Sequence, residues 1–600
     1  MSHLISEREL AFLLYEFLNT DQLLERPRYA EYSRHTFDAT LDAARRLATD
    51  YFAPHYREGD ECEPRFEAGE ARLLPQTGAA WRAFAEAGFL SAHWEAEEGG
   101  LGMPEVVLRA ALSQFFAANV ATAGYPFLTI GAANLLRTFG TDEQKARYLP
   151  AMGDGRSSGT MCLTEPGQGS ALGDIRTSAV LQPDGTYRIF GQKMFISGGE
   201  QDFTDNIVHM VLARIQGEPA GAKGISLFLV PKWLVNEGGS AGLRNDVALA
   251  GLLHKMGWHN TKSTVLSFGE QDGAVGYLVG QKNGGLAHMF QMMNEARIGV
   301  GLIAASLAWR GFSESLAYAR DRQQGRLPSQ KDPMSKQVAL IEHPDVRRLL
   351  IAQKAYSEGA LALCLYASSL FEDQHTHPDA GERRRAALLL DVLTPVVKSW
   401  PAKWGCASNE MAMQVLGGAG YTREYPLEQL YRDQRLNPIH EGAEAIHGLD
   451  LLGRKVSAKN GEGFRIFCLT VEEEIELAAS HPALHEFAGR LRGALTRLDA
   501  VTKLMIAAQS DVVDLALANA TVYLDVFGTV VVAWMWLKQA RVACSALAEG
   551  EKQNDTGYYF GKLQAARYYF NRELPAIDPQ FALLETFERT PFDMKDQWFQ

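Results

Sequence analysis

Apolar residues recur at helical spacing along the first quarter of the chain. Phe37, Leu41, Ala44 and Ala48 follow one another at intervals of three or four positions, which places their side chains on one face of a helix. Ala, Leu, Glu and Arg dominate the surrounding sequence. We therefore predict an N-terminal helical domain over residues 35–155, preceded by a helical extension over residues 1–34.

The pattern changes near Gly155, where short strand-like segments replace the helical spacing. Residues 177–182 and 187–190 are typical of two strands joined by a turn at Asp184–Gly185, a pair that favours tight turns. We predict a central β domain over residues 156–281. Its further candidate strands are residues 207–214, 225–230 and 263–268.

Helical spacing returns near residue 282 and continues to about residue 455, which predicts a helical bundle domain over residues 282–456. A polar, glycine-containing segment at 457–463 then introduces a C-terminal helical extension over residues 457–600. The predicted fold class is thus mainly α with a central β domain.

The longest uncharged apolar stretch near the C-terminus, residues 526–537, is interrupted by Gly528 and Thr529. A membrane-spanning helix needs roughly 20 apolar residues, so the stretch is too short to be one. We predict a buried helix there and no integral membrane segment.

Length and charge narrow the class of protein. A chain of 600 residues exceeds one hydrophobic core, and 46% apolar with 22% charged residues is ordinary globular composition. The 59 Lys and Arg against 72 Asp and Glu give a net charge of −13, which disfavours general nucleic-acid binding. The stretch 481–600 alone carries 12 basic and 14 acidic residues, a balance of −2. We predict no nucleic-acid partner.

Cysteine usage and the N-terminus bear on the cellular compartment. The six cysteines lie far apart without a C-x-x-C pair, which is neither a disulfide framework nor a zinc pattern. The N-terminus lacks a basic region followed by an apolar core. We expect a cytoplasmic protein.

Two motifs approach known binding signatures without completing them. In Gly167, Gly169 and Gly173 the third glycine comes one residue late for the dinucleotide pattern, and a strand is predicted to follow. His440–Glu441 begins like a zinc-protease motif, but Glu444 stands where the second histidine belongs. We predict no metal site.

Two other features stay open when the residues are considered alone. The glycine cluster 417–420 follows a helical stretch and is either a helix-ending turn or part of a binding site. Glu441 stands in a largely apolar segment bounded by proline, a setting that raises the pKa of a carboxyl and suits a general base.

An ordered series of motifs resembles the acyl-CoA dehydrogenase family. Met161–Ser170 reads MCLTEPGQGS and is similar to the flavin-binding segment T-E-P-G-x-G-S of that family. The others are GQKMFIS at 191–197, MNEAR at 293–297, YARDRQQG at 318–325, QVLGGAGY at 414–421, YRD at 431–433 and IHEG at 439–442.

The resemblance spans roughly residues 35–455 and implies a helical domain, a β-barrel domain and a four-helix bundle domain. The N-terminal segment and the long C-terminal block resemble the branch with larger subunits, which includes 3-(methylthio)propanoyl-CoA dehydrogenases. An extra C-terminal helical domain is therefore expected.

The resemblance also implies FAD, bound between the β domain and the second helical domain. Leu163 and Thr164 would meet the pyrimidine side of the flavin, and Ser170 the pyrophosphate. Phe195 would pack on the ring, and Ser197 would reach toward N5. The residues that would hold the FAD of a neighbouring subunit, in a homodimer or dimer of dimers, are Arg322, Gln414, Gly417 and Gly418.

The implied reaction is α,β-desaturation of an acyl-CoA thioester. Glu441 matches the catalytic base that takes the α-proton while the β-hydrogen leaves as hydride to FAD. Asn294 and Arg297 match positions near the acyl-CoA, and Ser170 and Gly442 are further expected substrate contacts. Electrons would then pass to an electron-transfer flavoprotein.

The segment around Glu441 departs from the usual family sequence Y-E-G-T. His440 replaces the tyrosine and either tunes Glu441 or is an aromatic-sized substitute, whereas Ala443 removes a hydroxyl. Two alternatives therefore stay open. One is an FAD-binding homologue without dehydrogenase activity, similar to alkylation-response proteins, although these carry a basic C-terminal surface. The other is an acyl-CoA oxidase.

Overall fold

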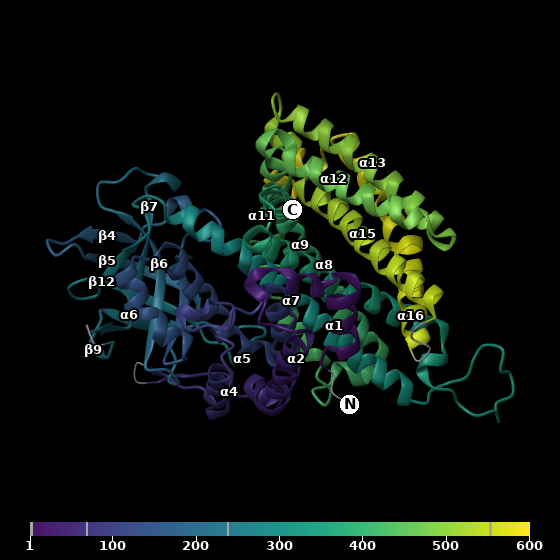
Figure 1. Ribbon diagram of the computed structural model, residues 1–600, viewed down its shortest axis with the longest axis horizontal. Helices are drawn as coiled ribbons and strands as arrows, with labels where there is room; N and C mark the ends of the chain where they lie inside the picture. Colours follow the sequence, from purple (N-terminus) through teal and green to yellow (C-terminus); the bar gives the residue numbers. More distant parts are fainter. Residues whose placement is uncertain (1–3, 68–69, 237–238, 551–554) are drawn as a thin grey trace.

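The computed structural model describes residues 4–67, 70–236, 239–550 and 555–600 (Figure 1). The β domain lies at one end of the molecule, long helices occupy its centre, and the last helices pack together beyond them. Residues 1–3, the start of the predicted N-terminal extension, lie outside the described residues. The predicted fold class, mainly α with a central β domain, is confirmed.

The N-terminal region is helical, as its apolar spacing predicts. Ser33 accepts a hydrogen bond at the start of α2, and Thr141 with Gln144 forms a capping box at α6. The long helix α5 changes course at Asn119, whose backbone angles are not helical. The helices are α1 Glu7–Ala11, α2 Arg34–Leu47, α3 Tyr56–Glu61, α4 Pro75–Glu86, α5 Glu105–Phe139 and α6 Asp142–Gly153.

Five strands of the main sheet in the β domain close into a ring. The strands of this sheet are β3 Ser157–Cys162, β4 Ser178–Leu181, β5 Tyr187–Ser197, β6 Asn206–Ile215, β7 Ile225–Pro231, β10 Val247–Leu252, β11 Ser263–Phe268 and β12 Ala274–Val279. β5 pairs with β12, β12 with β7, β7 with β6, β6 with β4, and β4 returns to β5. β3 adds beside β6, and β11 and β10 add beside β5.

All five segments predicted as strands are present, as β4, β5, β6, β7 and β11. β3, β10 and β12 were not predicted. Two short strand pairs form separate two-stranded sheets, β1 Phe66–Glu67 with β2 Glu70–Ala71 and β8 Trp233–Val235 with β9 Ala241–Arg244.

Three long helices form the centre of the molecule and pack against one another. They are α7 Gly285–Asp321, α8 Pro344–Thr376 and α9 Ala380–Leu416. Helix α5 packs along α7, and the short helices α10 Leu427–Gln434 and α11 Glu444–Asp450 pack on α9. The segment between α10 and α11 carries Glu441.

The C-terminal helices begin at the polar break that the sequence predicts. Lys459, Asn460 and Gly461 adopt left-handed backbone angles there. The predicted buried helix over 526–537 is confirmed as part of α15, which packs on α8, α9 and α11. The helices are α12 Ala458–Ala479, α13 His485–Ala508, α14 Val513–Leu517, α15 Ala520–Glu549, α16 Thr556–Tyr568, α17 Asp578–Glu585 and α18 Thr590–Asp593.

Among the described residues, α5 and α15 are long and apolar enough to cross a membrane by length and composition alone. The apolar window of α5 is entirely buried inside the protein, and that of α15 is mostly buried. Core helices of folded proteins meet the same criteria, so the two helices are weak evidence for a membrane span.

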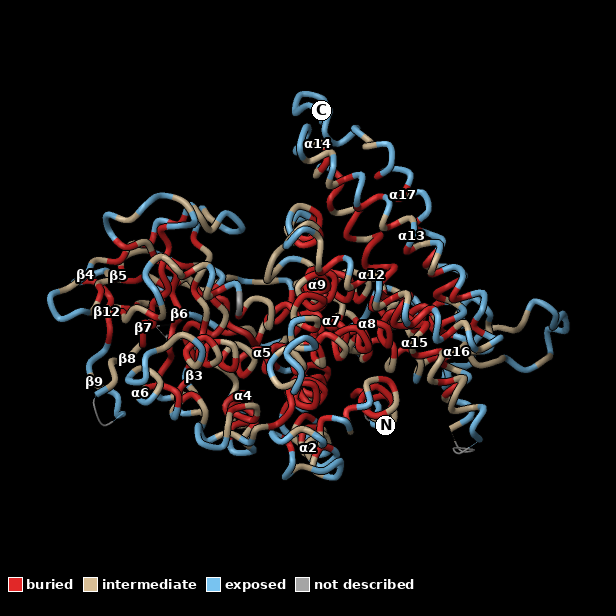
Figure 2. The backbone as a smooth tube through the Cα atoms, turned by 45° about the horizontal axis from the view of Figure 1, so that its top comes forward, coloured by how far each residue is buried: buried red, intermediate tan, exposed pale blue. Residues whose placement is uncertain are grey.

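The buried residues form one continuous core through the helical part of the chain (Figure 2). This core includes Phe12 near the N-terminus, Leu361 of α8, Val397 of α9 and Trp536 of α15. Two further clusters fill the β domain and its contact with α5 and α7. The C-terminal extension therefore shares its core with the central helices.

A buried lysine joins the two ends of the chain. Lys562 of α16 is fully buried, and its Nζ donates hydrogen bonds to Glu9 of α1 at 2.6 Å, Glu358 of α8 at 2.9 Å and Gln539 of α15 at 2.9 Å. A charge without water needs such partners, because burying it unpaired is very costly. This cluster fixes α1 and α16 to the same face of α8.

We predict that Lys562→Met strongly destabilises the protein. Removing one partner of a buried ion pair costs about 3–5 kcal/mol, because the remaining charges stay buried. Lys503→Met is the matched control, since Lys503 pairs with Asp499 at the surface with 72% of its side chain exposed. Urea unfolding followed by circular dichroism should show a large drop in midpoint for the first variant and none for the second. Equal midpoints would contradict the role of the cluster.

Candidate active site

Glu441 stands on a left-handed turn. Its φ is 52° and that of Gly442 is 93°. A residue with a side chain pays about 1–2 kcal/mol to adopt this conformation. The turn is held by two donors, because His447 Nε2 donates to the Glu441 carbonyl at 3.2 Å and Lys398 Nζ donates to the Gly442 carbonyl at 2.6 Å. Glycine is required at 442, since a Cβ there would lie 2.9 Å from His447 Nε2.

The Glu441 side chain has no hydrogen bond or ion pair with any described residue. Burial raises its pKa, and the nearby cations Lys398 and Arg297 oppose the rise. Both cations are committed elsewhere, Lys398 to the Gly442 carbonyl and Arg297 to Asp450 at 2.9 Å. The result is a carboxylate of raised basicity whose oxygens are free to take a proton.

Lys398 and Arg297 are themselves buried. Burial lowers the pKa of the Lys398 ammonium to about 7, so its charge is partly lost near neutral pH. The Arg297 Nε is buried without a partner among the described residues, and it is therefore a donor available to a bound molecule. Burial lowers the pKa of His447 to about 3, which leaves this ring neutral.

His440 packs as an aromatic ring beside Glu441. It meets Trp258 edge to face at 5.7 Å, and its Nε2 lies 3.1 Å from Asn437 Oδ1. Burial lowers its pKa to about 3, so it carries no charge near neutral pH. These contacts favour the interpretation of His440 as an aromatic-sized substitute for tyrosine.

Asp433, from the YRD motif, joins three parts of the fold. Its carboxylate accepts hydrogen bonds from the Trp258 backbone amide at 2.6 Å and from the Tyr56 hydroxyl at 2.8 Å. The neighbouring Arg432 donates to Asp60 of α3 at 2.8 Å. The motif therefore ties the segment before Glu441 to the β domain and to the N-terminal helices.

Helix α15 of the C-terminal extension packs against α11, the helix that follows Glu441. Helix α11 approaches α15 so closely that a Cβ at Gly448 would lie 2.7 Å from the Ala520 carbonyl oxygen. Lys403 of α9 pairs with both Glu444 of α11 at 3.1 Å and Asp525 of α15 at 2.6 Å. Ala443, at the start of α11, provides no side-chain cap. Helix α11 is thus held by its neighbours rather than by a cap.

The predicted flavin segment is fixed by a buried ion pair. Lys193 Nζ lies 2.9 Å from Glu165 and donates to the Leu163 carbonyl at 2.9 Å. Glu165 also accepts hydrogen bonds from the Arg176 and Thr177 backbone amides. The Thr164 carbonyl accepts from the Met194 amide at 3.0 Å. Residues 163–165 are thereby joined to β5.

Phe195 lies next to this segment in an unusual state. Its φ is 60°, and 60% of the residue's surface is exposed. Phe195 is thus exposed and strained near the end of β5. Such a residue fits a surface that a flat ligand covers. The predicted neighbours Leu163, Thr164 and Ser197 are partly exposed, and Ser170 is exposed. These residues fit a cofactor that binds along the edge of β5.

The remaining predicted cofactor residues lie together elsewhere. Arg322, Gln414, Gly417 and Gly418 line an open groove of about 750 Å³ between the ends of α7 and α9 and the start of α8. Gly417 has a φ of 60°, and nothing in the described structure lies within 4 Å of a Cβ at either glycine. The backbone of these two glycines is therefore uncovered, and a ligand can approach it closely.

The two predicted sets are far apart within one chain. Leu163 packs on the same cluster as Met293, near the start of α7, whereas Arg322 follows the last residue of that helix. At 1.5 Å per residue this separation is about 40 Å. One cofactor molecule cannot touch both sets in a single chain. Asn294, beside Met293, lines another cavity of about 360 Å³ with Asp391 and Lys459.

Several residues of the site were missed from the sequence. Glu165 and Lys193 lie inside the quoted motifs, so their opposite charges were an available signal. Lys398 was detectable as a lone lysine in the otherwise uncharged stretch 392–402. His447 carried no local signal, because its role depends on the turn of α11 toward Glu441.

Comparisons with known proteins agree with this architecture. Family descriptions match along most of the chain: "Acyl-CoA dehydrogenase, N-terminal domain" at 35–156, "middle domain" at 160–270, "C-terminal domain" at 283–456 and "Acetyl-CoA dehydrogenase C-terminal like" at 467–595. The fold and these matches define a class of flavin-dependent enzymes that are built from helical domains around a β domain. The chain belongs to the acyl-CoA dehydrogenase family.

Similar proteins differ in the acyl group that their names give. The 3-methylmercaptopropionyl-CoA dehydrogenase of Ruegeria pomeroyi is 36% identical, over 92% of this chain and 93% of its own length. The broad-specificity linear acyl-CoA dehydrogenase FadE5 of Mycobacterium tuberculosis is 33% identical over the full length of both. An acyl-CoA dehydrogenase of Bacillus anthracis complexed with FAD shares the fold, with a TM-score of 0.74 at 20% identity, covering 94% of this chain and 90% of that one.

Proposed function

We propose that this protein is an FAD-dependent acyl-CoA dehydrogenase in which Glu441 is the catalytic base. The observation that carries the proposal is the Glu441 turn. It leaves both the carboxylate and the backbone N–H of Glu441 without a partner among the described residues. The carbonyl oxygens of Glu441 and Gly442, in contrast, already accept hydrogen bonds from His447 and Lys398. A free base and a free donor on one residue suit removal of a proton next to a carbonyl.

The residues of this chain divide the work of binding and proton transfer. A Glu441 carboxylate oxygen takes the α-proton of the thioester. The Glu441 N–H donates to the thioester oxygen and stabilises the negative charge that develops there. When bound, FAD supplies the hydride acceptor for the β-hydrogen. Asn294, Arg297, Ser170 and Gly442 are proposed to contact the acyl-CoA.

Each residue proposed to contact FAD likewise has its own task. Phe195 would pack on the flavin ring and exclude water, and the Ser197 hydroxyl would donate a hydrogen bond toward its N5 edge. Leu163 and Thr164, with their backbone held by the Lys193–Glu165 pair, would hold the pyrimidine side. Ser170 would bind the pyrophosphate.

We predict that anaerobic addition of acyl-CoA bleaches the flavin of the wild-type protein and that Glu441→Gln abolishes the bleaching. The amide keeps the size of the side chain but cannot accept the proton. Absorbance near the flavin maximum is the measurement, and Glu444→Gln, in the same segment, is the control that should still bleach. Bleaching by Glu441→Gln at the wild-type rate would exclude Glu441 as the base.

The pH dependence of this reaction should report on Lys398. The base acts when deprotonated, so the rate rises with pH through the raised pKa of Glu441. Lys398→Met removes a positive charge that lowers the pKa of Glu441. The rise of the rate with pH, the acid limb of the profile, should therefore move to higher pH. Above about pH 7 the wild-type ammonium is itself lost, so the two profiles should converge there. Lys403→Met, on the same helix, should not shift the limb. A shift to lower pH would contradict the assignment.

We further propose a homodimer, or a dimer of dimers, in which FAD bridges two chains. The support is the separation of about 40 Å between the two predicted cofactor sets. Arg322, Gln414, Gly417 and Gly418 of one chain would hold the FAD that lies on β5 of its partner.

A mixing experiment should reveal this arrangement. Glu441→Gln and Arg322→Ala homodimers should each be inactive, the second through weak FAD binding. Co-expression should restore activity, because one site of the mixed dimer combines an intact Glu441 with an intact Arg322 from the other chain. Two Glu441→Gln chains carrying different tags are the control. Absence of restored activity in purified mixed dimers would refute cofactor sharing.

An electron-transfer flavoprotein is the proposed electron acceptor. The two alternatives give different results when air is admitted after the anaerobic assay. An acyl-CoA oxidase would reoxidise its flavin rapidly with oxygen and produce hydrogen peroxide, whereas a homologue without dehydrogenase activity would bind FAD and remain unbleached by every acyl-CoA.

A further inference from the structure

A small cavity lies between α5, α7 and β3, next to the proposed reaction site. Met161 of β3 and Met292 and Ala296 of α7 line it. Met161 packs on the same cluster as Leu163, a proposed flavin contact, and Ala296 precedes Arg297, one of the cations near Glu441. An acyl group held between flavin and base would therefore direct its distal carbons into this cavity.

The cavity is very small. Its volume is about 20 Å³, which accommodates about one water-sized group. Apolar side chains form most of its wall, as an acyl chain requires. Its size rather than its polarity therefore limits what enters from the reaction site.

Phe127 occupies the space along one side of the cavity. Its ring lies against Gly299 of α7, so closely that a Cβ at 299 would lie 2.3 Å from Phe127 Cε2. The same ring meets Phe116 edge to face at 5.8 Å. Phe127, on the second half of α5, is thus packed between Phe116 of the first half and Gly299 of α7.

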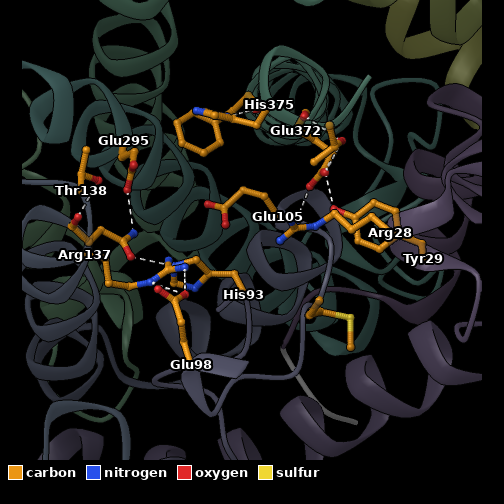
Figure 3. A pocket seen from close by; sticks show the side chains of 14 residues that line it. Arg28, Tyr29, His93, Glu98, Glu105, Arg137, Thr138, Glu295, Glu372 and His375 are labelled. Carbon is orange, nitrogen blue, oxygen red and sulfur yellow. Dashed lines mark hydrogen bonds and ion pairs between the residues drawn. The ribbon is translucent and has the colours of Figure 1, made fainter. Parts of the chain in front are cut away.

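Glu295 also lines the cavity. Its carboxylate accepts a hydrogen bond from Asn134 Nδ2 at 2.9 Å, and Asn134 Oδ1 lies 2.7 Å from His93 Nε2. Beyond it lies a second cavity of about 280 Å³, which Glu295 also lines (Figure 3). Charged groups, including Glu98, Arg137, Glu105 and Glu372, surround this second cavity.

A hydrocarbon chain too long for the small cavity would meet the Phe127 ring or, at Glu295, this charged cavity. It would displace water from charged groups without offering them hydrogen bonds, which is unfavourable. The wall at Phe127 is steric. The wall at Glu295 is polar, since burial raises the pKa of this carboxyl to about 7.

We propose that Phe127 and Glu295 close the acyl cavity and restrict the enzyme to short-chain acyl-CoA thioesters. This inference rests on the proposed function, because it takes the reaction to occur between the flavin and Glu441. Phe127 sets the length that fits, and Glu295 keeps longer apolar chains out when the ring is displaced.

The test compares butanoyl-, hexanoyl-, decanoyl- and palmitoyl-CoA in anaerobic flavin bleaching. The wild-type holoenzyme should reduce fastest with butanoyl-CoA, at least about tenfold above decanoyl-CoA, a difference of the size that pocket contacts produce. Phe127→Ala should speed bleaching by hexanoyl- and decanoyl-CoA and slow bleaching by butanoyl-CoA. Phe127→Leu is the milder variant should the alanine protein fail to fold.

Glu295 is tested in the widened cavity. Glu295→Leu should extend the range to palmitoyl-CoA only when combined with Phe127→Ala, whereas Glu295→Gln, which keeps a polar end, should not. Equal bleaching of the wild-type protein by butanoyl- and palmitoyl-CoA would overturn the inference and leave the proposed function standing.

Binding separates the two hypotheses if no acyl-CoA bleaches the flavin. Calorimetry with the FAD-loaded Glu441→Gln protein measures affinity without turnover. Tighter binding of butanoyl- than of decanoyl-CoA, reversed by adding Phe127→Ala, would support the cavity assignment even though dehydrogenation had failed. No preference between the two thioesters would overturn it.

Discussion

Two buried donors on the Glu441–Gly442 turn are the constraint on which the site depends. A left-handed turn that presents the glutamate also directs both carbonyls into the protein, where each needs a hydrogen bond. His447 and Lys398 supply these bonds from α11 and α9. Their positions depend in turn on α15, which packs against α11 at Gly448. The C-terminal extension is thus part of the support of the proposed base.

The same principle recurs wherever domains meet. Asp433 joins the segment before Glu441 to the β domain and the N-terminal helices, and Glu165 with Lys193 joins the proposed flavin-binding segment to β5. Each is a buried charge satisfied by groups distant in sequence. Such contacts favour one relative placement of the domains, because any other leaves a charge unpaired.

Local patterns explain which parts of the fold were predictable. Helical spacing identified the helical regions and strand alternation identified five strands, because both patterns depend on neighbouring residues. The ring closure of the sheet, which needs the parallel pairing of β4 with β6, has no local signal. Glu441 was found through a motif, whereas His447 and Phe127 act through contacts made only in the folded chain. The compartment, the electron acceptor and the individual site assignments stay predictions.

The Lys562 cluster has a consequence for biosynthesis. Glu9 and its buried cation Lys562 are separated by 553 residues, so Glu9 is synthesised long before Lys562. Until Lys562 is made, the carboxylate of Glu9 must remain in water, and α1 cannot take its final place on α8. Folding of the segment around Glu9 therefore waits for α16, which leaves its apolar residues in need of protection while the chain grows.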